Sequence, residues 1–134
     1  MDFDVNWPAV LVATIAHQAL GALWYGVIFR DMWMRAIGMN PEQIERQAPG
    51  GEMVFGIIAS ALSVVTLGLV LTAYTDPSTG DGIVLGLLTG LGFVTAATFM
   101  NGAYEQKKPI LSALFGAYYT LGLMIAGGIL GAWR

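Results

Sequence analysis

The chain has no cysteine and very little charge. Without cysteine it can form neither disulfides nor thiolate metal sites. Only 11% of its 134 residues are charged, whereas a typical soluble domain carries about 25%. The net charge of −3 provides no basic surface of the kind that binds nucleic acid. The sequence also lacks a zinc-protease helix motif, a nucleophile elbow and a phosphate-binding glycine loop. We therefore expect a non-enzymatic protein without a cofactor.

Apolar residues are abundant instead, at 56% of the chain, and the mean hydropathy is +0.66. A small soluble domain buries only about two-thirds of its chain surface, too little to hide so many apolar side chains. Four runs contain no Asp, Glu, Lys or Arg: residues 8–29, 53–74, 82–101 and 110–133. Each can cross about 30 Å of hydrocarbon as a helix, and lipid offers the backbone no other partners. The sequence predicts one all-α domain over residues 1–134, an integral membrane four-helix bundle.

The connections between these runs differ in length. Residues 75–82 and 102–109 are short turns rich in residues that break helices. The long connection, residues 30–52, contains DMWMRAIGM, whose mixture of apolar and charged residues suits a segment lying in the membrane interface. It also contains NPEQIERQ, in which Asn40 caps a short helix that begins at Pro41. We expect a short interfacial helical segment between the first two spans.

Positive charge is unevenly distributed over the connections. Residues 30–52 and 102–109 contain five Lys and Arg residues, and the opposite side contains only Arg134. The positive-inside rule therefore predicts that these two connections are cytoplasmic and that both termini lie outside. A signal peptide begins with basic residues, but the segment before the first run has no Lys or Arg. We therefore expect the first run to be a membrane helix and not a cleaved signal peptide. These features predict a multi-pass protein of the cell membrane.

Three polar residues, Thr14, His17 and Gln18, lie near the middle of the first run. A polar or ionisable side chain at this depth is costly and is by default a candidate for function. His17 is the chain's only histidine and no acid lies in any run, so we expect no metal site. Either His17 is neutral and hydrogen-bonded across helices, or it belongs to a permeation or ligand-binding spot. In both cases it should face the protein interior. The candidate partners are Ser60, Ser63, Thr95 and Tyr118.

An aromatic cluster marks the end of the first run. Trp24 and Tyr25 lie near its end, and Trp33 follows in the connection. Aromatic belts and snorkelling arginines are typical of membrane boundaries, so an interfacial anchor is one interpretation and a ligand-contacting cluster is the other. Arg30 and Glu105 are candidates for an ion pair that joins the two cytoplasmic connections.

Glycines recur at intervals of four, at Gly82, Gly86 and Gly90 and again at Gly127 and Gly131. Small residues with this spacing let membrane helices approach closely. Two interpretations stay open. These faces hold the four helices of one chain together, or one of them, with the Gly82–Gly86–Gly90 stripe as first candidate, forms a homodimer.

Three stretches carry aromatic and glycine motifs: LGALWYGVIFRDMWMRAIGM at 20–39, AYEQKKP at 103–109, and GAYYTLGLMIAGGILGAW at 116–133. They resemble the bacterial membrane family catalogued as domain of unknown function 1761. The resemblance covers nearly the whole chain and implies a four-span fold in a bacterial membrane, but no activity. Tyr104 stands where the family more often has Phe, and His17 and Gln18 are not part of the pattern. The matching residues are Gly21, Leu23, Trp24, Tyr25, Trp33, Met34, Glu105, Pro109, Gly116, Tyr118 and Trp133.

Three functions are compatible with these features. The first is a non-enzymatic bundle that forms a homo-oligomer or docks as an accessory subunit on a larger membrane complex. The second is a small solute or ion transporter or channel made of paired chains, with Thr14, His17 and Gln18 lining its pathway. The third is a lipid or quinone binder that uses the aromatic cluster. Membrane lipids are partners in all three.

Overall fold

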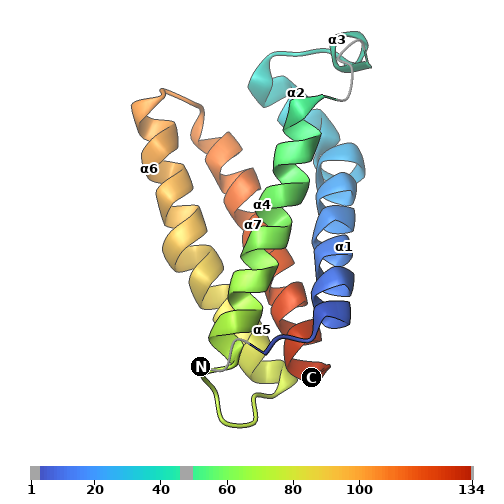
Figure 1. The fold of residues 1–134 in the computed structure, drawn as a ribbon. Helices are drawn as coiled ribbons and strands as arrows, with labels where there is room; N and C mark the ends of the chain where they lie inside the picture. The colour runs from blue at the N-terminus through green and yellow to red at the C-terminus, as the bar shows by residue number, and fades with distance from the viewer. Residues whose placement is uncertain (1–3, 46–49, 134) are drawn as a thin grey trace.

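The computed structural model describes residues 4–45 and 50–133, most of which are helical (Figure 1). Residues 1–3, 46–49 and 134 lie outside the described part. The elements in chain order are α1 (Trp7–Leu23), η1 (Trp24–Ile28), α2 (Arg30–Ile37), α3 (Pro41–Glu45), α4 (Gly51–Leu71), α5 (Thr79–Thr89), η2 (Gly90–Thr95), α6 (Ala96–Tyr104) and α7 (Pro109–Ala132).

Four helical stretches are long and apolar enough to cross a membrane: Trp7–Ile28, Gly51–Leu71, Thr79–Tyr104 and Pro109–Ala132. The predicted all-α fold and the four spans are confirmed. The chain passes up and down between two ends. One end holds α2, α3 and the turn between α6 and α7, and the other end holds both chain termini (Figure 1). The two connections that carry most of the positive charge therefore lie at the same end.

The third span is longer than the sequence predicted, because it begins at Thr79 and not at Gly82. Ser78 caps it: Ser78 Oγ accepts a hydrogen bond from the Asp81 backbone N–H at 3.2 Å, and Asp81 Oδ2 accepts one from the Ser78 N–H at 2.8 Å. The charge of Asp81 excluded it from the predicted run, yet a carboxylate in this position satisfies backbone groups that are free at a helix start. At the far end the helix continues to Tyr104.

The connection between the first two spans contains the predicted helical segments. The helix α2 ends at Gly38, whose φ of 72° lies in the left-handed region that glycine adopts without strain. Asn40 then starts α3, since its Oδ1 accepts from the Gln43 N–H at 2.8 Å and Gln43 Oε1 accepts from the Asn40 N–H at 2.9 Å. This reciprocal pair is the cap that the sequence predicted at Asn40.

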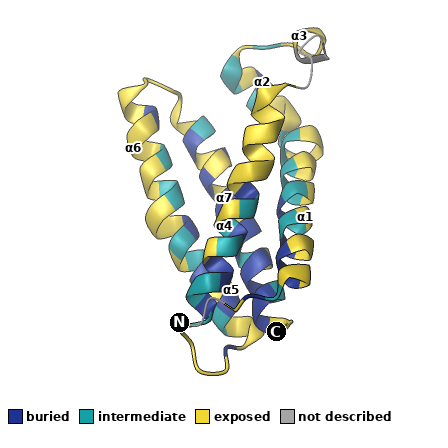
Figure 2. Cartoon of the chain, viewed as in Figure 1, coloured by how far each residue is buried: buried dark blue, intermediate teal, exposed yellow. Residues whose placement is uncertain are grey.

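The last helix, α7, forms the centre of the bundle. Half of its apolar stretch is buried, against 28% or less in each of the other spans. It contacts α1, α4, α5 and α6, and the buried residues gather along it and toward the end with the termini (Figure 2). The other helices therefore hold together mainly through α7.

Glycines make the contact between α5 and α7 possible. A Cβ atom at Gly82 would overlap the Gly127 carbonyl, and one at Gly86 would overlap the Leu123 carbonyl. At Gly90 it would lie 2.6 Å from Thr120 Cα. Within the chain the stripe therefore packs against α7, which agrees with the first of the two interpretations.

The helix α4 is packed over only half of its length. Its buried residues begin at Ser60, and every residue from Gly51 to Ala59 is exposed. Figure 2 shows this exposed half near α2 and α3. The end of the bundle that carries the positive charge is therefore loosely packed.

Candidate functional site

His17 is completely buried where α1, α4 and α7 meet. Its Nδ1 lies 3.0 Å from Ser60 Oγ and 3.1 Å from the Tyr118 hydroxyl. The rings of Tyr118 and Tyr119 meet it edge to face, with centroids at 5.2 and 4.6 Å. The expected interior orientation is confirmed, and two of the four predicted partners, Ser60 and Tyr118, are bonded to it. His17 therefore links the three helices.

The polar neighbours of His17 are also satisfied by the protein. Gln18 Nε2 donates to Ser60 Oγ at 2.7 Å and to the Gly56 carbonyl at 2.9 Å. Thr14 Oγ1 donates to the Val10 carbonyl one turn earlier, at 2.8 Å. These bonds remove the cost of polar groups inside an apolar bundle. The arrangement supports a structural cross-link between α1 and α4.

Close packing leaves little room around the His17 ring. A Cβ atom at Gly122 would lie 2.6 Å from His17 Cδ2 and 2.8 Å from Nε2, so only glycine fits there. Nε2 is buried and has no hydrogen-bond partner within the described part of the chain. A second link lies beside it, since Ser63 Oγ and the Tyr119 hydroxyl are 2.7 Å apart. This region is a closely packed polar core.

The predicted aromatic cluster is divided in the structure. The rings of Trp24 and Phe29 are 4.6 Å apart, whereas Tyr25 packs at 5.4 Å on Trp33 and at 5.8 Å on Tyr118. The cause is the π-helical segment η1, in which the Phe29 N–H donates to the Trp24 carbonyl at 2.8 Å. Such a segment adds a residue to the helical turn and rotates the side chains that follow. Tyr25 and Trp33 thus leave Trp24 and face α7.

A cavity of about 540 Å³ lies beside Tyr25 and Trp33, at the end of the bundle that holds α2. Three aromatic rings line it from three elements, namely Tyr25 from η1, Trp33 from α2 and Phe115 from α7. No residue of α4 lines it. The other lining residues are Ile37, Ala97, Thr98, Asn101, Gly102, Lys107, Leu111 and Ser112.

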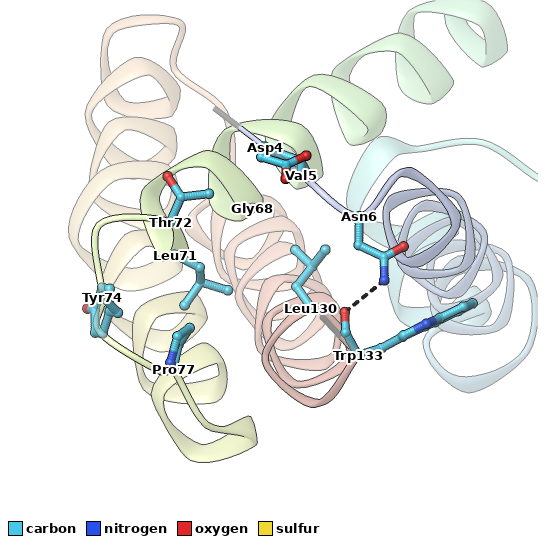
Figure 3. Close-up of a pocket in the computed structure, with 10 residues that line it drawn as sticks. All are labelled: Asp4, Val5, Asn6, Gly68, Leu71, Thr72, Tyr74, Pro77, Leu130 and Trp133. Carbon is cyan, nitrogen blue, oxygen red and sulfur yellow. Dashed lines mark hydrogen bonds between the residues drawn. The ribbon is translucent and has the colours of Figure 1, made fainter. Parts of the chain in front are cut away.

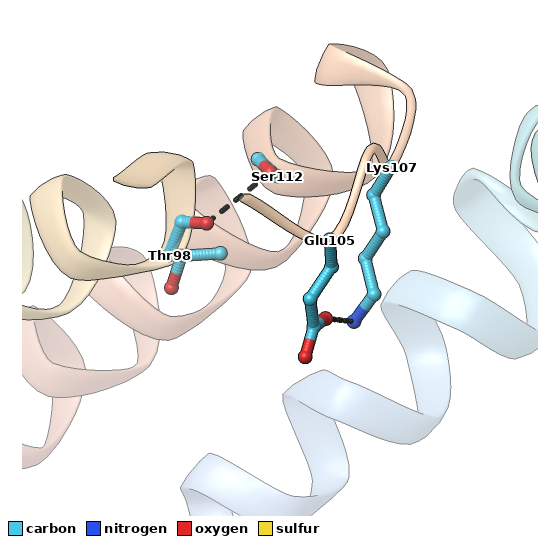
Figure 4. Close-up of polar contacts among 4 residues, drawn as sticks. All are labelled: Thr98, Glu105, Lys107 and Ser112. Carbon is cyan, nitrogen blue, oxygen red and sulfur yellow. Dashed lines mark hydrogen bonds and ion pairs between the residues drawn. The ribbon is translucent and has the colours of Figure 1, made fainter. Parts of the chain in front are cut away.

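Polar residues contribute to the lining of this cavity, and Figure 4 draws three of them, Thr98, Lys107 and Ser112. Ser112 Oγ donates a long hydrogen bond of 3.4 Å to the Thr98 carbonyl. Lys107 Nζ lies 2.8 Å from Glu105 Oε2, and both side chains are about half exposed. The hydrogen bond from Lys107 lowers the pKa of the Glu105 carboxyl. Among the described residues Glu105 pairs with Lys107 and not with Arg30, because two residues of one turn meet more easily than two separate connections.

One protein family matches nearly the whole chain. A family model described as "Protein of unknown function (DUF1761)" matches residues 8–131. The chain belongs to this family. The match includes the His17 core and the residues that line the cavity, whereas Trp133 lies beyond it. No curated protein and no solved structure matches the chain. A function for this DUF1761 protein must therefore be argued from its own site.

Some residues of the site in this DUF1761 chain were not among the candidates from the sequence. Phe115 is one of them, although it lies three and four residues before Tyr118 and Tyr119, a spacing that places all three side by side on a helix. The rings confirm this, since the Phe115 and Tyr119 centroids are 5.4 Å apart. Thr98 and Ser112 carried no signal that separates them from the many other hydroxyls in the spans.

A second cavity, of about 420 Å³, lies at the opposite end of the DUF1761 bundle (Figure 3). Residues 4–6, the end of α4 with the connection to α5, and the end of α7 line it. Asn6 Nδ2 donates to the Trp133 carbonyl at 3.3 Å. Aliphatic residues of the core, Leu71 and Leu130, form part of its wall. The Asn6–Trp133 hydrogen bond links the two ends of the described chain beside this cavity.

Proposed function

We propose that this DUF1761 protein is a non-enzymatic membrane protein that holds an amphipathic small molecule, such as a lipid, in the cavity beside Tyr25 and Trp33. One observation carries the proposal: Tyr25, Trp33 and Phe115 surround about 540 Å³ from three separate elements, with polar side chains on one side. Ligand sites are typically concave, about 300–1,000 Å³ in volume, and lined by aromatic residues with a few polar groups. An amphipathic molecule has a polar head group for the polar side chains and an apolar chain for the aromatic rings.

The proposed position of the cavity in the membrane supports this assignment. It lies beside α2, the segment whose sequence suits the membrane interface, and at the end with the positively charged connections. By the positive-inside rule we place this end on the cytoplasmic side of a bacterial cell membrane, with both termini outside. A head group at this depth would meet the polar side of the cavity, and a chain would meet the rings.

Filling the cavity tests the proposal. Ala97 lines it, whereas its neighbour Ala96 is equally exposed and does not. We expect wild-type protein and Ala96→Trp, released from mild detergent into a native mass spectrometer, to carry the same bound small molecule. Ala97→Trp should lose it, because the indole would occupy the space. Equal retention by both variants, or no bound molecule in wild type, would contradict the proposal.

We propose a second function, association with another copy or with a larger membrane complex, on one specific observation. Phe55 and Ile58 in the first half of α4 are 76% and 58% exposed, and every residue from Gly51 to Ala59 is exposed, although Gln18 of α1 donates to the Gly56 carbonyl. The absence of native cysteine allows a clean test, since Phe55→Cys introduces a single thiol. We expect disulfide-linked products from Phe55→Cys in membranes but not from Val84→Cys, which is exposed on α5. Equal cross-linking of both would indicate random collision.

Transport by paired chains receives no comparable support. The candidates for a pathway, Thr14, His17 and Gln18, form hydrogen bonds within the protein through Thr14 Oγ1, His17 Nδ1 and Gln18 Nε2, and they line neither of the two cavities. A solute that passed them would have to break these bonds.

A further inference from the structure

We infer that the cavity selects amphiphiles with an anionic head group, a phosphate or a carboxylate, and that Lys107 is the residue that contacts it. This inference rests on the proposed function and names the class of ligand. Among the described residues that line the cavity, Lys107 is the only one with a charged side chain. Its ammonium group, which pairs with Glu105 beside the cavity, is the positive charge that an anionic head group would contact.

The ion pair with Glu105 does not prevent this contact. Glu105 lies outside the cavity wall, and the pair is about half exposed to solvent. Exposed ion pairs of this kind contribute little to stability. A head group that approaches from the cavity can therefore replace Glu105 as the partner of the Lys107 ammonium.

The apolar wall determines the other half of the ligand. Trp33 and Phe115 form it together with Ile37 and Leu111. Burying an acyl or isoprenoid chain against these side chains contributes roughly 0.8 kcal/mol per buried CH₂ group. A free anion lacks this contribution, so inorganic phosphate alone should not fill the site.

Competition between two lipids tests the inference. Detergent-solubilised protein is offered phosphatidylglycerol and phosphatidylcholine with identical acyl chains, and native mass spectrometry gives the ratio of the bound species. We expect wild type to prefer phosphatidylglycerol about fivefold, the value of one exposed charge contact. Lys107→Gln should remove the preference but still bind lipid. Lys108→Gln, which changes the net charge equally at a residue outside the cavity wall, should keep it.

Different outcomes separate the two proposals. An equal loss of preference in Lys107→Gln and Lys108→Gln, or no preference in wild type, would overturn the inference and leave lipid binding intact. Displacement of bound phosphatidylglycerol by millimolar inorganic phosphate would show a simple anion site, which also overturns it. Retention of lipid by Ala97→Trp at the wild-type level would overturn the proposed function itself. Lys107 is half exposed, so its replacement leaves the fold unchanged.

Discussion

Replacing Gly86 by alanine should separate α5 from α7. A Cβ atom at Gly86 would lie 2.5 Å from the Leu123 carbonyl carbon and 2.6 Å from the Met124 nitrogen, whereas ordinary contact begins at 3.4 Å. The helices would have to move apart by about 0.9 Å, since backbone atoms cannot rotate away as a flexible side chain does. The movement would also loosen the contacts of Gly82, one turn away on the same face.

The expected cost follows from this overlap. Overpacking by a methyl group typically costs about 1–3 kcal/mol, and we expect the upper end, about 3 kcal/mol, because two backbones collide. The free energy of unfolding can be measured by titrating the protein in mixed micelles with sodium dodecyl sulfate and following circular dichroism. The matched control is Gly56→Ala, because nothing lies within 4 Å of a Cβ atom there. This control should leave stability unchanged or raise it by up to about 1 kcal/mol.

The result also decides between the two interpretations of the glycine stripe. If Gly86→Ala unfolded at the same detergent fraction as wild type and Gly56→Ala, the close contact between α5 and α7 would be refuted. If it dissociated an oligomer without lowering the stability of the single chain, the stripe would be an interface between chains and our assignment would be wrong.

Three further predictions concern single contacts. Ser60→Ala removes one partner of His17 and the acceptor of a glutamine amide, so it should lower the free energy of unfolding by about 2 kcal/mol in the same titration; unchanged stability would contradict the polar core. Ser78→Ala removes the cap of α5 and should cost about 1 kcal/mol, and a neutral result would argue against the capping box. Lys107 lowers the pKa of Glu105, so their pair stabilises the folded turn above the ordinary pKa of 4.5, and this is lost as the pH falls through the lowered value. Lys107→Gln should return the pKa toward 4.5, and an unchanged carbon-13 titration of Glu105 would contradict the pairing.

The spans and their connections could be predicted from the sequence because their causes are local. A run without charge that is long enough to cross hydrocarbon has to be helical, whatever surrounds it. The cap at Asn40 could likewise be predicted, since it depends on residues only three positions apart. The start of the third span was harder to predict. The charge of Asp81 placed it outside the predicted run, although Asp81 belongs to the cap of the helix.

The site depended on contacts between residues far apart in the chain. Trp24 and Tyr25 are adjacent and point in different directions from the helix, and only the packing of α2, α6 and α7 decides that Tyr25 is the one that lines the cavity. The glycine spacing predicted a close contact but not its partner, which α7 provides within the same chain. Hydropathy thus determines that these helices are long and apolar enough to cross a membrane, since that depends on each segment alone. Which faces meet, and where a cavity remains between them, follows only from packing all four together.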